Sequence, residues 1–340
     1  MQKAIQFIGT QRSGSNLLRV MLHQHPEICA PHPPHILQHF MPLLPMYGDL
    51  QIDSNFKRLV IDVCRLVELN PVSWNMHFDR EEVAARCENA ALPQVMKALY
   101  ELKAESKNAS HWCCKSMASI HYVHEMEAAN IHPFYIFIYR DGRDVALSFL
   151  NAIVGEKHIY HLAQQWKEEQ ELSMALYEKV GEERCIKICY EQFVEHPEPI
   201  LKAICAKLKI DYSPAMLQYT ESEESKETAA SGKMWANLVK PVMKNNTKKF
   251  LSGLHRDEIK LFEYVAGETL QALGYSLEFP LAKNEKISDE EIENYNEINV
   301  RAKMESRKLA AKEDLEKRAA QDEFIAQLKT QFTQFKAVVS

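Results

Sequence analysis

The chain lacks the cysteine spacings that build metal and redox sites. Its eight cysteines form no Cys-x-x-Cys pair and no Cys/His set with zinc-site spacing. This absence excludes a zinc ribbon or zinc finger as the basis of function. Cys185 and Cys189 lie in an apolar run and are expected in the core. We therefore predict reduced thiols, no bound metal and a cytoplasmic location.

Long apolar runs and an excess of positive charge are also missing. No apolar run approaches the ~20 residues of a membrane span, and the chain begins directly with a predicted strand, without a signal peptide or transmembrane segment. With 41 Lys and Arg against 47 Asp and Glu, the formal net charge is −6, so no general basic surface for nucleic acid is expected. An apolar fraction of 46% is enough for a sizeable core in a chain of 340 residues.

The most informative stretch is a loop near the start of the chain. It follows a short apolar run at 4–8, which predicts a buried strand, and precedes a predicted helix at 17–25. A strand, a glycine-bearing loop and a helix together present backbone N–H groups and a positive helix end to an anion. The loop therefore predicts a cradle for phosphate or a phosphate-like group. Its residues are Gly9, Thr10, Gln11, Arg12, Ser13, Gly14, Ser15 and Asn16.

This loop lacks the lysine of nucleoside-triphosphate-binding loops. In those loops a Lys follows the second glycine and precedes Ser or Thr. Here Ser15 occupies the lysine position and Asn16 follows it. A small-molecule kinase is therefore disfavoured, although magnesium-dependent ATP turnover would favour it again. A strand-to-helix turn without a ligand is the simplest alternative for the loop alone.

A second unit of the same kind lies in the middle of the chain. The clearest predicted strand, 133–139, runs into Arg140 and a helix that starts near residue 141 or 142, with Ser148 two turns along it. Two such units suggest a ligand with two separate anionic groups. Lys115 and Tyr190 end two further predicted strands, and the ends of parallel strands on one side of a sheet form one crevice.

Alternating strands and helices predict the fold class. We expect an α/β, P-loop-like three-layer fold with a mainly parallel central sheet flanked by helices, over residues 1–280. The polar stretch 220–233 predicts a mobile loop, possibly a lid. Further helices are expected at 54–70, 79–107 (with Asp79 as N-cap), 121–130, 159–180, 197–208 and 256–273.

Residues 281–340 differ in composition and predict a charged helical C-terminal extension. Residues 288–323 predict one long solvated helix. A heptad-like seam follows, which docks either on this chain or on a second copy in a homodimer. The seam consists of Ile325, Leu328, Phe332, Phe335 and Val339.

Two motifs resemble those of the sulfotransferases that use 3′-phosphoadenosine 5′-phosphosulfate (PAPS). The loop at 9–16 resembles the family's 5′-phosphosulfate loop. Residues 139–148 resemble its 3′-phosphate motif, in which an Arg after a strand and a Ser eight positions later bind the 3′-phosphate. Residues 190–193, Tyr-Glu-Gln-Phe, are similar to the family's Tyr-Glu-Asp-Leu segment, and 233–275 to its C-terminal part. Roughly residues 3–278 thus resemble the bacterial branch of this family.

The resemblance implies in-line transfer of a sulfuryl group from PAPS to a hydroxyl or amine, without a metal. It implies that loop 9–16 holds the 5′-phosphosulfate, that Arg140 and Ser148 bind the 3′-phosphate, and that Tyr190 and Lys233 belong to the nucleotide site. Arg12 stands where many members have a Lys. Because a guanidinium stays charged, we assign Arg12 charge stabilisation and not proton donation. Lys115 is assigned to the sulfuryl group.

The general base departs from the family pattern. Cytosolic relatives use a His after a Lys-Thr pair, but Lys115 and Ser116 are followed by Met117. Bacterial relatives often carry a Glu after the first helix, where this chain has a histidine- and proline-rich segment, 25–40. We select His35, then His32, as candidate bases; the alternative is that each is an ordinary surface histidine.

The acceptor is not defined by the sequence. Aromatic, Met and Pro residues in 31–48 suggest an apolar pocket for a small-molecule, lipid or glycan acceptor. A non-enzymatic nucleotide-binding or scaffold protein is the alternative, since the family base is missing. It would be supported if the donor bound but no acceptor were sulfated.

Overall fold

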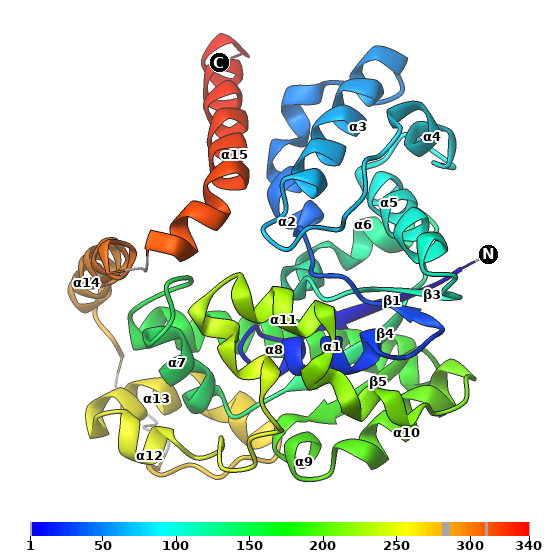
Figure 1. The fold of residues 1–340 in the computed structure, drawn as a ribbon. Helices are drawn as coiled ribbons and strands as arrows, with labels where there is room; N and C mark the ends of the chain where they lie inside the picture. The colour runs from blue at the N-terminus through cyan, green and yellow to red at the C-terminus, as the bar shows by residue number, and fades with distance from the viewer. Residues whose placement is uncertain (1, 281–285, 310–311, 340) are drawn as a thin grey trace.

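A five-stranded parallel sheet forms the centre of the molecule in a computed structural model, which describes residues 2–280, 286–309 and 312–339 (Figure 1). The strand order is β2-β3-β1-β4-β5, and every strand pair in these ranges is parallel. The strands are β1 (Lys3–Ile8), β2 (Ile28–Cys29), β3 (His111–Cys114), β4 (Phe134–Tyr139) and β5 (Cys185–Cys189). Four of them were predicted; the two-residue β2 lies inside segment 25–40.

Side chains alternate between the two faces of the sheet and build two cores. On β4, Tyr135 and Phe137 belong to one hydrophobic cluster, whereas Ile136 and Ile138 belong to the other. The first cluster includes side chains of α3, α5, α8 and α13, and the second those of α1, α9 and α10. Period-two alternation in strands covered on both faces gives three layers. The predicted three-layer α/β fold is confirmed.

Most of the predicted helices form near their expected bounds. The helices are α1 (Ser15–His23), α2 (Ile36–Phe40), α3 (Asp53–Glu68), α4 (Arg80–Ala85), α5 (Leu92–Ser106), α6 (Val123–Ala128), α7 (Gly142–Leu150), α8 (Ile159–Arg184), α9 (Tyr190–Glu195), α10 (Pro197–Leu208), α11 (Glu223–Ala230), α12 (Phe250–Gly253), α13 (Arg256–Ala272), α14 (Asp289–Lys308) and α15 (Lys312–Val339). Short 3-10 helices are η1 (Met41–Tyr47), η2 (Met117–Tyr122), η3 (Pro214–Glu221) and η4 (Lys233–Val239).

The predicted single helix 79–107 is wrong. Asp79 does cap a helix, since its side chain accepts hydrogen bonds from the N–H groups of Glu81 and Glu82, but that helix ends at Ala85. A second helix starts at Leu92 with Pro93 in its first turn. A proline fits the first turn of a helix and not its interior, which explains the break.

The predicted mobile loop at 220–233 is also wrong, because most of it is helix α11. Arg19 of α1 is fully buried and forms an ion pair with Glu224; it also donates a hydrogen bond to Thr228 Oγ1 at 2.8 Å. A buried guanidinium requires such partners. The polar composition of this stretch therefore serves a buried ion pair and not a solvated loop.

The C-terminal extension forms two helices, α14 and α15, instead of the single helix predicted at 288–323. α15 stands beside α3 in Figure 1. Phe324, Ile325 and Leu328 are buried, and Arg65 of α3 lies over the Phe324 ring at 4.9 Å. The predicted seam therefore packs on this chain; the side chain of Val339 lies outside the described residues. A homodimer through the extension stays a prediction.

All eight cysteines are free. None of the described helices combines the length and the apolar character needed to cross a membrane.

Candidate active site

The first loop folds as a turn that only glycine permits at two positions. Gly9 has φ 109° and Gly14 has φ 82°, both in the left-handed region. A Cβ on Gly9 would collide with the Ile138 carbonyl oxygen, and one on Gly14 with the Tyr190 ring. The loop is thus packed directly against β4, the strand of the second predicted motif, and against Tyr190 at the start of α9. Arg12 also has a positive φ, 70°, an unusual conformation for a non-glycine residue.

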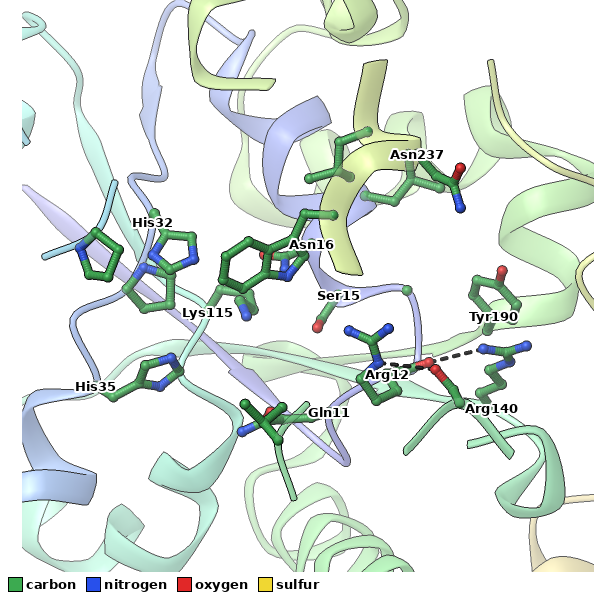
Figure 2. Close-up of a pocket in the computed structure, with 18 of the residues that line it drawn as sticks. Gln11, Arg12, Ser15, Asn16, His32, His35, Lys115, Arg140, Tyr190 and Asn237 are labelled. Carbon is green, nitrogen blue, oxygen red and sulfur yellow. Dashed lines mark hydrogen bonds between the residues drawn. The ribbon is translucent and has the colours of Figure 1, made fainter. Parts of the chain in front are cut away.

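The two predicted anion-binding units meet through their arginines (Figure 2). Arg12 Nε donates a hydrogen bond to Ser148 Oγ at 3.0 Å, and Arg140 Nη1 donates to the Arg12 carbonyl oxygen, also at 3.0 Å. The Arg140 guanidinium lies over the Tyr190 ring, 4.5 Å from its centroid. Arg140 Nη2 also lies 3.7 Å from Asp144 Oδ2, within ion-pair distance. Arg140 Nε is buried and has no hydrogen-bond partner within the described residues.

One cavity of about 400 Å³ collects most of the predicted site residues. Figure 2 shows the loop side chains on one side of it and the two histidines on the other. Of the predicted residues, those lining the cavity are Gln11, Arg12, Gly14, Ser15, Asn16, His32, His35, Lys115, Arg140, Ser148 and Tyr190. Residues far apart in the chain, such as Arg12, Lys115 and Tyr190, thus share one cavity, as the shared edge of a parallel sheet predicts.

Lys115 is a buried cation that has no counter-ion among the residues the structure describes. It follows β3 and is 6% exposed, and no acceptor among the described residues forms a hydrogen bond or ion pair with it. Burial, reinforced by the charges of Arg19 and Arg12, lowers the pKa of its ammonium group to about 7. The pKa of Arg12 is also lowered, by burial and by the charge of Arg140. This end of the cavity is therefore suited to bind an anion.

The two candidate bases lie in the cavity wall and not on the surface. His35 Nδ1 lies 2.9 Å from Ser116 Oγ, which orients the ring. Burial, then the charge of Lys115, holds the pKa of His35 well below its usual value. His32 is buried and neither of its ring nitrogens has a partner in the described part of the chain. Burial likewise lowers the His32 pKa.

Four predicted residues do not line the cavity. Gly9, Thr10 and Ser13 lie behind the loop surface, and Thr10 and Ser13 are buried. The Lys233 side chain is exposed, and its backbone N–H donates a hydrogen bond to Asp314 Oδ2 at 3.2 Å.

A polar layer behind the loop was missed by the sequence analysis. Gln170 Nε2 of α8 donates to Thr10 Oγ1 at 2.9 Å, and the neighbouring Glu169 is 5% exposed. Burial raises the pKa of Glu169 to about 7. The only sequence signal was a Glu-Gln pair inside a helix whose other inward positions are mostly apolar, such as Trp166. Within the described ranges, no group of three or more His, Cys, Asp or Glu side chains could hold a metal ion.

This fold and this site define a class of protein that places cationic side chains at the junction of two strand–loop–helix units. A profile of the Sulfotransferase family matches residues 5–214, and the chain belongs to that family of transferase enzymes. The recognition made from the two motifs is confirmed.

The curated relatives are similar over most of this chain. Protein-tyrosine sulfotransferase A of Caenorhabditis elegans is 24% identical over 281 residues, covering 78% of this chain and 66% of the relative. The protein-tyrosine sulfotransferase of Drosophila melanogaster is 23% identical over 279 residues, covering 78% and 50%. The chain thus spans between half and two thirds of the length of these relatives.

A solved structure supports the fold. The sulfotransferase domain of the Synechococcus PCC 7002 olefin synthase aligns with a TM-score of 0.51 at 21% identity, covering 82% of this chain and 96% of that domain. At this identity the likeness concerns the fold alone.

Proposed function

We propose that the sulfuryl donor is PAPS and that its two anionic ends occupy the two strand–loop–helix units. The observation that carries this proposal is the junction of Arg12, Ser148 and Arg140 in one cavity. Arg140 and Ser148 hold the 3′-phosphate, and the backbone N–H groups at the start of α1 hold the 5′-phosphosulfate. Tyr190, already stacked on Arg140, lies beside the nucleoside.

Arg12 and Lys115 supply the charge stabilisation. Sulfuryl transfer is expected to resemble phosphoryl transfer in its loose transition state, so positioning and charge neutralisation dominate. Arg12 neutralises the leaving phosphate oxygen. Lys115, which has no carboxylate partner among the described residues, binds the sulfuryl oxygens and regains its full charge when it does so.

His35 acts as the general base. Its Nδ1 is engaged with Ser116, so Nε2 accepts the proton of the acceptor hydroxyl. The acceptor oxygen then forms a bond to sulfur while the bond between sulfur and the bridging oxygen of the donor breaks, leaving adenosine 3′,5′-bisphosphate. His32 is the second candidate.

The acceptor is a hydroxyl or amine of a small molecule, lipid or glycan. A phenolic hydroxyl is supported by the names of the curated relatives, which act on protein tyrosine. We also propose that 1–280 forms the sulfotransferase domain and that 281–340 is an appended helical region.

Calorimetry on the full chain tests the donor site. Adenosine 3′,5′-bisphosphate is compared with adenosine 5′-phosphate, which lacks the 3′-phosphate, in the wild type and in Arg140→Met. The bisphosphate is expected to bind at least tenfold more tightly, and Arg140→Met to abolish that preference. Equal binding of both nucleotides by the wild type would refute the donor assignment and favour the kinase or scaffold alternatives.

A further inference from the structure

Part of the cavity wall comes from the C-terminal extension, outside the family-matched residues 5–214. α15 is fixed against the body of the protein: Gln321 Nε2 donates to the Leu66 carbonyl oxygen at 3.1 Å, and Phe324 and Leu328 are buried. The position of this wall is therefore defined by packing. The side chains of α15 that line the cavity are Arg318, Gln321, Asp322 and Ile325.

Arg318 is a second cation of this cavity, and within the described residues it has no ion-pair partner. Its guanidinium lies over the Trp235 ring at 4.9 Å. Its Nε and Nη2 atoms are buried and have no hydrogen-bond partner within the described residues. Asp322 and Asp314 attract it only at longer range, since neither forms an ion pair with it. Burial lowers the pKa of Arg318, as expected for a guanidinium removed from water.

Burying Nε and Nη2 of a guanidinium without hydrogen-bond partners costs free energy unless a ligand supplies the missing acceptors. Its planar fork matches the two oxygens of a carboxylate. The Trp235 ring holds the guanidinium in place by packing against it, and the His32 ring in turn makes a T-shaped contact with Trp235, with ring centroids 5.0 Å apart. The donors are thus oriented in advance, which reduces the entropy lost on binding.

We propose that Arg318 binds a carboxylate of the acceptor, so that the substrate class is hydroxylated carboxylic acids. This inference rests on the proposed sulfotransferase function. A monoanion fits better than a phosphate because the carboxylate of Asp322, on the same wall, already offsets part of the positive charge. The same cavity offers an apolar surface for the body of the acceptor, formed by Leu238, Val242, Met243 and Ile325.

The test measures binding of matched acids and amides to the full chain saturated with adenosine 3′,5′-bisphosphate. The probes are ω-hydroxydodecanoate and 4-hydroxyphenylpropanoate, each beside its neutral carboxamide, titrated by calorimetry. At least one acid is expected to bind about tenfold or more tightly than its amide. Arg318→Gln should reduce the affinity for the acid to that for the amide. Arg318→Lys should keep part of the preference, because it retains the charge but not the fork.

Lys308→Gln is the matched control, because it removes one positive charge from the extension at an exposed position of α14 outside the cavity lining. It should leave the acid preference unchanged. Equal affinities for acid and amide in the wild type, failure of both acids to bind at about 10 mM, or a preference that survives Arg318→Gln would each overturn the inference. Nucleotide binding in the same samples separates the two proposals: if the bisphosphate binds and the acid preference is absent, only the role of Arg318 fails.

Discussion

Raising the pH from 7.0 to 8.5 is expected to weaken binding of adenosine 3′,5′-bisphosphate because Lys115 loses its proton. In the free protein the pKa of Lys115 is about 7, lowered first by burial and then by the fixed charges of Arg19 and Arg12. The bisphosphate has no sulfuryl group, so its 5′-phosphate supplies the missing counter-ion and raises that pKa. Binding therefore takes up a proton above pH 7, and the complex is favoured at the lower pH.

The size of the effect follows from the protonated fraction of Lys115. With a pKa of about 7, roughly half of Lys115 is charged at pH 7.0 and about 3% at pH 8.5. If the bound ammonium stays protonated across this range, the affinity falls roughly 15-fold, or about 1.6 kcal/mol. The nucleotide phosphates titrate near pH 6, below this range. His32 and His35, whose pKa values lie well below their usual value, stay neutral throughout it.

Calorimetry at a series of pH values, in buffers of different ionisation enthalpy, measures both the affinity and the proton uptake. Lys115→Arg keeps a permanent charge and should bind with no pH dependence above pH 7. Lys115→Met should bind weakly and also without pH dependence. The reasoning is refuted if the wild-type affinity is constant from pH 7.0 to 8.5, or if Lys115→Arg shows the same slope as the wild type.

Three further predictions concern packing and catalysis. Gly14→Ala should abolish nucleotide binding in calorimetry, because the residue has φ 82° and an added Cβ collides with an aromatic ring; tight binding would contradict this geometry. Glu224→Ala should lower the free energy of unfolding by about 3–5 kcal/mol, since it leaves Arg19 buried without its ion pair. Urea titration measures the free energy of unfolding, and Glu223→Ala, at the exposed neighbouring position, should change it by less than about 0.5 kcal/mol. His35→Asn should reduce kcat by about 10²–10⁴-fold while the bisphosphate affinity stays unchanged, and unaltered kcat would exclude His35 as the base.

The sequence predicts well the part of the cavity proposed to bind PAPS, because short-range sequence patterns determine its structure. Two strand–loop–helix units, each with a basic residue at a strand end, place Arg12 and Arg140 at one sheet edge whatever the rest of the chain does. Tyr190 follows from the same rule. The polar residues Glu169 and Gln170 could not be predicted, because helix periodicity does not show which polar side chains face inward.

The other side of the cavity depends on contacts between distant segments. The polar stretch 220–233 resembles a solvated loop until Arg19 is known to be buried beneath it, and the charged extension resembles a free arm until Phe324 and Leu328 are seen to pack near α3. Amino-acid composition predicts whether a segment would be solvated on its own. The positions of these two segments depend instead on a few contacts with buried residues elsewhere in the chain.

The unpaired cations connect stability with function in this protein. Lys115 is buried and Arg318 is half-buried, and neither has an ion-pair partner within the described residues. The two lie at different parts of one cavity, Lys115 beside the phosphate loop and Arg318 on the helix that closes the far wall. A donor with an anionic sulfuryl group and an acceptor with a carboxylate would neutralise one cation each. Such an arrangement binds the donor through Lys115 and the acceptor through Arg318. A ligand that neutralises one of these cations does not neutralise the other, which separates the two binding sites. The acceptor hydroxyl is then held between the two bound charges.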